Sequence, residues 1–95
     1  MPYMIQTTPD PEKAHLREQL VKAHSGYLEQ NQTIILAAGV LMEEDGKNVG
    51  GLLIIDVDER VAAERFVRDD PFAPLFASVV IKRWRKGFFN FKRAT

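Results

Sequence analysis

Apolar residues occur along this chain in two patterns, as short β-rich runs and as segments with helical spacing. Four short runs, rich in β-branched and aromatic residues, predict strands at residues 3–7, 33–41, 52–57 and 76–84. Helical spacing predicts one helix over residues 11–30 and a second over residues 61–69. The predicted order of elements is therefore β-α-β-β-α-β.

Residues typical of helix ends flank both predicted helices. Asp10 is a candidate cap and Pro11 suits the first helical position, while Asn31 follows the last residue of the helix. Asp58 is the expected cap of the second helix. Pro71 excludes the residue before it from the helical conformation, so we expect the second helix to end there.

The charged segment EEDGKNVGG between the second and third strands indicates a hairpin loop, with Gly50 and Gly51 as turn residues. Right-handed crossovers in the two βαβ halves place both helices on one face of a four-stranded antiparallel sheet, which is the ferredoxin-like α+β fold. The second and third strands, which we take as central, have apolar residues on both faces. The face without helices would then expose a large apolar patch, so we predict a homodimer that packs through this open sheet face.

The composition predicts a single domain over residues 1–95, with residues 85–95 as a basic, aromatic tail. No apolar stretch approaches the ~20 residues of a membrane span, and the N-terminus lacks a signal pattern, so we expect a cytoplasmic protein with no membrane partner. The absence of cysteine excludes disulfides and thiolate metal sites. Because the chain has two histidines without ligand spacing and no nucleotide motif, we predict no metal and no cofactor.

The formal net charge is zero, but the charges are unevenly distributed. From residue 82 onward there are six basic residues and no acidic ones. A basic tail of this kind can contact nucleic acid or a membrane, or it can lie on an acidic surface of its own chain or of a partner. We favour the contact with an acidic protein surface.

His24 stands where the helical spacing favours an apolar residue. At about 100° per residue, Leu16 and Tyr27 share one stripe, and His24 lies close beside it. A histidine that faces the covered region is either a core residue bonded to the backbone or an acid–base group, because free imidazole titrates near pH 6.5. His15 lies off the stripe and Ser25 faces a different direction, so we expect both on the surface.

Three short motifs, AHSGYL at residues 23–28, LAAGVL at 36–41 and DPF at 70–72, together resemble the YciI-like family. That family has a histidine followed by a large side chain and leucine, a glycine near the end of the second strand, and an Asp-Pro-aromatic motif. The resemblance extends over nearly the whole chain. The sequence departs from the family pattern at residues 31–32, Val40 and Val21, where glycine, proline and arginine are common.

The resemblance implies a dimeric α/β barrel with a histidine–aspartate pair, here His24 and Asp70, in a pocket between helix and sheet. Relatives with assigned chemistry eliminate chloride from chlorinated hydroxyhydroquinones, and the wider fold group includes muconolactone isomerase-like enzymes and small monooxygenases. The implied function is proton transfer by His24, oriented by Asp70, in an elimination or isomerisation of a small cyclic or aromatic acid. The structural alternative is that Asp70 only caps the turn made by Pro71.

Four other residues are candidates for contact with this small-molecule ligand: Tyr3, Gly39, Phe72 and Trp84. The three aromatic residues could line the pocket, or they could be ordinary core residues. Gly39 could open space for the ligand, or it could mark a bulge without a ligand role.

Two other classes of function remain open. One is a non-catalytic ligand-binding or interaction protein on the same dimer scaffold. The other is RNA binding, because KGFFNF at residues 86–91 resembles the basic and aromatic stretch of RNA-recognition sheets. That stretch belongs on a central strand, whereas KGFFNF follows the fourth strand, so the sequence does not favour nucleic acid as a partner.

Overall fold

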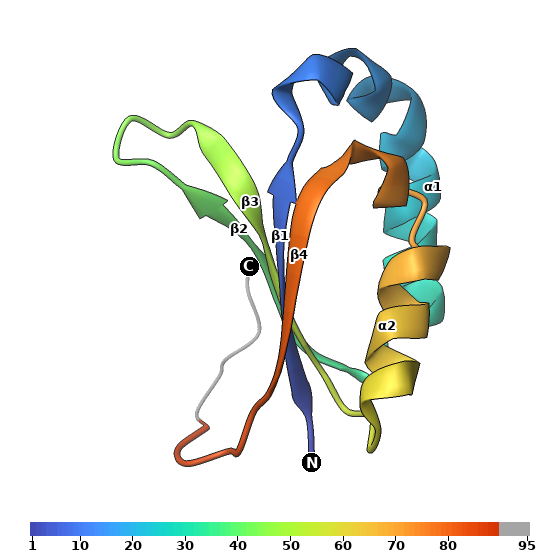
Figure 1. The fold of residues 1–95 in the computed structure, drawn as a ribbon, viewed down its shortest axis with the longest axis vertical. Helices are drawn as coiled ribbons and strands as arrows, with labels where there is room; N and C mark the ends of the chain where they lie inside the picture. The colour runs from blue at the N-terminus through green and yellow to red at the C-terminus, as the bar shows by residue number, and fades with distance from the viewer. Residues whose placement is uncertain (90–95) are drawn as a thin grey trace.

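A computed structural model describes residues 1–89, and its elements follow the predicted order (Figure 1). The strands are β1 (Tyr3–Pro9), β2 (Ile35–Met42), β3 (Asn48–Ile55) and β4 (Phe76–Arg83). The α-helices are α1 (Arg17–Gln30) and α2 (Arg60–Asp69), and two short 3₁₀ segments are η1 (Pro11–Leu16) and η2 (Ala73–Leu75). The ferredoxin-like fold predicted from the sequence is therefore confirmed.

The four strands form one antiparallel sheet in the order β2-β3-β1-β4. The second strand of the chain thus lies at an edge, and our choice of the second and third strands as the central pair was wrong. The two crossovers insert β1 between β3 and β4, because each βαβ connection skips one strand position.

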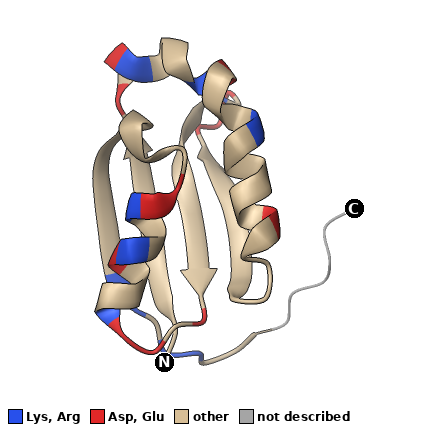
Figure 2. Ribbon diagram, turned by 90° about the vertical axis from the view of Figure 1, so that its right-hand side faces the viewer, with Lys and Arg blue, Asp and Glu red and all other residues tan. Residues whose placement is uncertain are grey.

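Both helices lie against the same face of the sheet, as Figures 1 and 2 show. On that face Ile5 pairs with Leu53 of β3 and with Ile81 of β4. Ile5 and Ile55 are fully buried, and they form one cluster with Ala63 and Phe66 of α2 and with Tyr3, Leu53 and partly buried neighbours. The hydrophobic core therefore lies between the sheet and the two helices.

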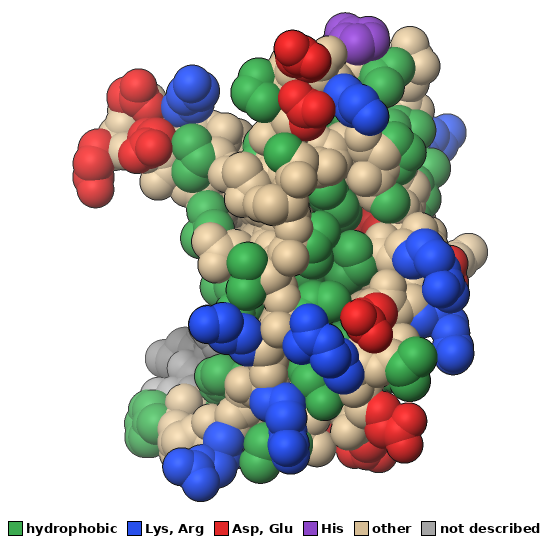
Figure 3. Space-filling view, viewed as in Figure 1, with side chains coloured by type: hydrophobic (Ala, Val, Ile, Leu, Met, Phe, Trp, Pro, Cys, Tyr) green, Lys and Arg blue, Asp and Glu red, His purple; other side chains and the backbone are tan. Residues whose placement is uncertain are grey.

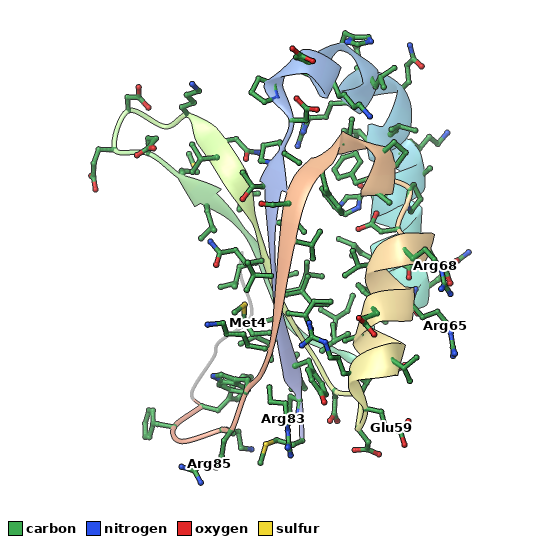
Figure 4. All side chains as sticks on the ribbon, viewed as in Figure 1. Met4, Glu59, Arg65, Arg68, Arg83 and Arg85 are labelled. Atoms are coloured by element: carbon green, nitrogen blue, oxygen red, sulfur yellow. The ribbon has the colours of Figure 1, made fainter. Side chains whose placement is uncertain are left out.

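The opposite face of the sheet has no helix on it. The alternate residues of β1 point to this face, and Met4 is seen there on the side away from the helices (Figure 4). Met4 pairs with Ile54, and the next residue on this face, Gln6, pairs with Leu52 and Val80. The open face predicted from the sequence therefore exists, and it carries apolar residues of β1, β3 and β4 together with Gln6 and Lys82.

Only one of the two helix caps predicted from the sequence is present. Asp10 accepts a hydrogen bond from the backbone N–H of Glu12 (3.0 Å), as expected of a cap, but residues 11–16 form a 3₁₀ segment before the α-helix begins. Asp58 does not cap α2: the cap position is Glu59, and its side chain makes no capping bond. The carboxylate of Asp58 instead lies 3.5 Å from the amino group of Met1.

The two glycines predicted for the hairpin turn belong to β3 instead. The turn glycine is Gly46, which has a φ of 91°. Gly50 lies in the ladder, where a Cβ would clash with the carbonyl oxygen of Thr7, and a Cβ on Gly51 would come within 3.0 Å of the Thr7 hydroxyl. Close approach of β1 to β3 therefore explains this pair of glycines.

The basic residues at the end of the described chain do not find acidic partners within it. Lys82, Arg83, Arg85 and Lys86 follow one another, and basic side chains gather over the lower part of β4 and the segment after it (Figure 3). Within residues 1–89 no ion pair joins these four residues to a carboxylate. Lys86 lies over the ring of Phe89 (5.8 Å), and the remainder of the predicted tail, residues 90–95, lies outside the described residues. None of the helices in the described part is long and apolar enough to cross a bilayer.

Candidate active site

A cavity of about 480 Å³ lies between α1, the sheet and the segment that follows α2. Its volume is within the ~300–1,000 Å³ range typical of small-ligand sites. Much of its wall is apolar, with Val21 and Leu28 from α1, and Leu53 and Leu75 from the opposite side. His24 and Asp70 line the same cavity. The space can therefore hold a small, largely apolar molecule next to two ionisable groups.

His24 and Asp70 are in direct contact. The Nδ1 atom of His24 lies 2.8 Å from the Oδ1 atom of Asp70. The Asp70 side chain is only 5% exposed and the His24 side chain 21% exposed. Because both side chains are largely shielded from water, the electrostatic attraction between them is screened less than that of a surface ion pair. The fold thus brings together two residues that are 46 positions apart in the sequence.

The position of Asp70 follows from the proline after it. Pro71 excludes the helical conformation for Asp70, which has φ −67° and ψ 128° and ends α2. In this extended conformation its Oδ1 also accepts a hydrogen bond from the backbone N–H of Phe72 (2.9 Å). The capping role is therefore present as well, and the same oxygen serves both contacts.

Phe72 also holds the ring of His24 in place. The two rings stack with their centroids 3.9 Å apart and their planes 8° from parallel. Within residues 1–89, Nδ1 is the only ring nitrogen of His24 that makes a hydrogen bond. When Asp70 is ionised it can only accept, so Nδ1 carries the proton and Nε2 of the neutral ring is left with a free lone pair. This arrangement can remove a proton from a molecule in the cavity and return it.

Tyr27, one turn after His24, ties α1 to α2. Its hydroxyl donates a hydrogen bond to the backbone carbonyl of Phe66 (2.7 Å), and the two rings are in tilted contact at 5.1 Å. Burial raises the pKa of Tyr27 to about 12, with further contributions from the negative charges of Asp69 and Asp70. The hydroxyl therefore stays protonated as a donor, and it helps to hold His24 beside Asp70.

The residues predicted to contact a ligand lie in two different places. Gly39 and Phe72 line the cavity. Gly39 lies in regular pairing with Leu52, and a Cβ on it would meet nothing within 4 Å, so the bulge expected as its alternative role is not at this position. Tyr3 and Trp84 do not line the cavity.

The placement of Tyr3 and Trp84 corrects our prediction of an aromatic pocket. Tyr3 is 6% exposed in the core near the start of β1. Trp84 directly follows β4, where its backbone N–H bonds to the carbonyl of Pro2 and its ring meets Phe89 edge-on at 6.4 Å. Both residues lie toward the end of the sheet where β1 begins, whereas the cavity lies toward the end of β1.

Sequence reasoning missed three features of the cavity wall. Arg17 lines it, although the sequence offered only one signal, namely that Arg17 lies seven residues, about two helical turns, before His24. Ser25 and Gly51 line it as well, although we expected surface and turn positions for them. In the described part of the chain no three His, Cys, Asp or Glu side chains gather as a potential metal site.

Comparison with known proteins identifies related sequences and folds. The sequence model of the YCII-related domain matches residues 1–85. The fold is similar to that of 5-chloro-2-hydroxyhydroquinone dehydrochlorinase (TftG) from Burkholderia phenoliruptrix AC1100, in complex with 2,5-dihydroxybenzoquinone. The two have 29% identity and a TM-score of 0.80 over 92% of this chain and 96% of the other. Rv0793 from Mycobacterium tuberculosis has a similar fold at 10% identity, with a TM-score of 0.52 over 90% of this chain and 95% of the other. No curated protein matches the sequence significantly.

Proposed function

Because the chain belongs to the YCII-related domain family, we propose that it is a small enzyme of the lyase or isomerase type. Its substrate is a small cyclic or aromatic acid. His24 acts as the general acid or base, and Asp70 orients it. The observation that carries this proposal is the 2.8 Å contact between His24 Nδ1 and Asp70 Oδ1 on the wall of a cavity of about 480 Å³.

The geometry supports a simple sequence of proton transfers. The free Nε2 of His24 takes a proton from an acidic C–H or O–H group of the bound molecule. The imidazolium that forms is stabilised by the carboxylate of Asp70, which accepts hydrogen bonds from Phe72 N–H and from His24 Nδ1–H. In an isomerisation the proton is then returned to a different atom of the substrate. In an elimination the electron pair of the broken C–H or O–H bond forms a new double bond, and the leaving group departs as an anion with the electron pair of its own bond while His24 keeps the proton.

The similarity to TftG supports the reaction class. TftG is a dehydrochlorinase, so its reaction removes hydrogen and chloride from a hydroxylated ring, and it forms a complex with the single-ring molecule 2,5-dihydroxybenzoquinone. A ring of that size fits a cavity of about 480 Å³ with a largely apolar wall. The stacked pair of His24 and Phe72 offers a flat surface beside which such a ring can lie.

Turnover by a His24→Asn variant tests the proposed function. The purified protein is incubated with 5-chloro-2-hydroxyhydroquinone, and the release of chloride is measured. We expect the wild type to release chloride and His24→Asn to be slower by about 10²–10⁴-fold, which is the usual contribution of a general acid or base. His15→Asn is the matched control because His15 is exposed. Equal rates for wild type and His24→Asn would refute the proposal, and tight binding without chloride release would favour a non-catalytic binding protein.

We also infer that two copies pack through the open sheet face. This face carries Met4, Leu52, Ile54 and Val80, and the Val80 side chain is 41% exposed. Burial of such a patch against a second copy is favourable by about 25 cal/mol per Å² of apolar surface. We expect sedimentation to give a dimer for the wild type and a monomer for Val80→Lys, because the lysine would be buried without a partner.

The matched control for this variant is Val61→Lys, which places the same charge on an exposed position of α2 (51% exposed) and should leave the dimer intact. A wild-type protein that sediments as a monomer at all concentrations would contradict the dimer. The same conclusion would follow if Val80→Lys remained as dimeric as Val61→Lys.

A further inference from the structure

A second cavity, an open groove of about 300 Å³, lies between the C-terminal half of α1 and the start of β2. We call it the α1–β2 groove, and its wall consists of Ser25, Leu28, Glu29, Gln32, Ile35 and Ala38. Ser25, Leu28 and Ala38 also line the larger cavity that holds the histidine–aspartate pair. The groove therefore adjoins the candidate active site, but the proposed proton transfer does not use it.

The α1–β2 groove combines apolar walls with negative charge. Leu28 and Ile35 supply apolar surface, and in residues 1–89 the carboxylate of Glu29 takes part in no ion pair. The helix α1 ends beside the groove at Gln30 and has no basic residue in its last turn. The partial negative charge of its last backbone carbonyls thus adds to the charge of Glu29. A segment with a large apolar side chain and positive charges would match this groove.

The segment that follows β4, residues 84–89, has this matching chemistry. Phe88 is 86% exposed, and burying its ring would remove a large apolar area from water. Arg85 and Lys86 form no ion pair with a carboxylate within residues 1–89. The segment turns to the side of the sheet that has no helices (Figure 1). It therefore points to the side on which the second copy packs in the proposed dimer.

The register of the sheet sets the groove and the segment at the same level along the strands. Arg83, at the end of β4, pairs with Tyr3. Tyr3 and Ile35, the first residue of β2, both pair with Ile55. In a face-to-face dimer with its two-fold axis along the strands, the β4 edge of one copy lies opposite the β2 edge of the other, and the level along the strands is unchanged. The segment of one copy then begins opposite the groove of the other.

The segment is long enough to reach the partner's groove. Facing sheets lie about 10 Å apart, and Phe88 follows Arg83 by five residues, which span roughly 16 Å when extended. In its own chain the segment would have to cross the open face to reach the groove, because β2 and β4 are opposite edges of the sheet. The second copy occupies that face in the proposed dimer.

We propose that residues 84–89 of one copy dock in the α1–β2 groove of a second copy, with the Phe88 ring on the apolar walls and the basic side chains near Glu29. This inference rests on the dimer proposed above, and it fixes the two-fold axis along the strands. An axis across the strands would set β2 opposite β2 and would leave the segment away from the groove. Because the groove shares three wall residues with the larger cavity, each docked segment lies next to the candidate active site of its partner.

Disulfide cross-linking tests the docking directly, because the chain has no cysteine of its own. Gln32→Cys places a thiol on the groove wall, and Gly87→Cys places one beside Phe88, at a position where a Cβ meets nothing within 4 Å. The variant with both substitutions is oxidised with diamide and separated under denaturing, non-reducing conditions. A disulfide needs Cα atoms within about 7 Å of each other. We expect a covalent dimer with a bond between positions 32 and 87 of different chains.

The matched control combines Gly87→Cys with Met42→Cys. Met42 is exposed and lies at the other end of β2, roughly 23 Å along the strand from Ile35. This pair should give no covalent dimer. Equal cross-linking of the two double variants would mean that the segment has no fixed place on the partner, and a disulfide within one chain would place the segment on its own sheet. Either result overturns the proposal.

The dissociation constant of the dimer provides a second measurement. Phe88→Ala should raise it about tenfold or more, as the loss of a buried aromatic ring implies. Val61→Ala truncates another exposed apolar side chain, on α2, and should change it less than about twofold. Sedimentation over a range of concentrations measures both. Equal dissociation constants for the two variants would contradict the docking of Phe88.

Failure of the docking can be distinguished from failure of the proposed function. A wild-type dimer that Val80→Lys dissociates, but that gives no cross-link between positions 32 and 87, overturns the docking alone. A wild type that sediments only as a monomer overturns the docking together with the dimer. Equal chloride release by wild type and His24→Asn overturns the acid–base function, whereas a cross-link found in the same protein still supports the docking.

Discussion

The contact between His24 and Asp70 predicts a measurable coupling free energy between two residues that are 46 positions apart in the sequence. We propose a double-mutant cycle with His24→Gln, Asp70→Asn and the combined variant, measured as free energies of unfolding. Asp70→Asn also weakens the hydrogen bond from Phe72 N–H. That effect occurs in both variants that carry the substitution, so it cancels in the cycle.

The size of the coupling can be estimated from the exposure of the two groups. A hydrogen bond to a charged group contributes about 1.5–3 kcal/mol, whereas an exposed ion pair contributes about 0–1 kcal/mol. Asp70 is 5% exposed and His24 is 21% exposed, so the pair lies nearer the buried limit, discounted for the part of the imidazole that water reaches. We therefore expect a coupling of about 1.5 kcal/mol.

Urea unfolding followed by circular dichroism is a suitable assay. With a denaturant slope of about 1.5 kcal/mol per M, which is usual for a small domain, the coupling corresponds to a midpoint difference of about 1 M. A second cycle with His15→Gln and Asp70→Asn is the control, because His15 is exposed in η1. The changes that these two substitutions cause in the free energy of unfolding should add within about 0.5 kcal/mol. A coupling no larger for His24 than for His15 would refute the contact.

Two further predictions concern stability. Gly50→Ala should destabilise the fold by about 2 kcal/mol, because the added Cβ would clash with the Thr7 carbonyl. The control is Gly39→Ala, whose Cβ would meet nothing within 4 Å. Equal urea midpoints for the two variants would show that β1 and β3 do not approach so closely. The pKa of Tyr27 is raised to about 12 in the folded protein, from about 10 in an unfolded chain. The neutral hydroxyl therefore adds to the free energy of unfolding, and this contribution is complete below pH 10 and lost as the pH rises toward 12. Unfolding measured between pH 9 and 11.5 should therefore show a steeper loss for the wild type than for Tyr27→Phe, and parallel losses would contradict the burial of this hydroxyl.

The secondary structure could be predicted where it depends on neighbours in the sequence. Asp10 caps the first helical segment because its carboxylate reaches an N–H two residues later, and Pro71 ends α2 because its ring excludes the helical conformation of Asp70. Local chemistry failed where a distant residue competes. Asp58 does not cap α2. Its carboxylate lies near the amino group of Met1, which precedes β1 and is far from Asp58 in the sequence.

The candidate site was predicted in the same uneven way. The helical spacing placed His24 on the covered side of α1, and the resemblance to a known family named Asp70 as its partner. Tyr3 and Trp84 were predicted to contact the ligand, yet the register of β1 with β4 sets both toward the opposite end of the sheet. Periodicity shows which face of a strand a residue occupies, but it does not show at which end of the sheet a cavity opens.

The order of the elements, the position of His24 on the covered side of α1 and the extended conformation of Asp70 could all be predicted from the sequence. These properties depend on periodicity and on steric restrictions between adjacent residues. The covered side of α2 could not be predicted: the helical spacing grouped Val61 with Phe66, but Val61 is exposed and Ala63 is buried. Tertiary structure alone decided that β2 lies at the edge, that Gly50 makes room for the backbone of Thr7, and that one oxygen of Asp70 meets the ring of His24. Each of these contacts joins residues that are distant in the chain, and it forms only because burying the apolar faces of α1 and α2 on one sheet brings those residues together.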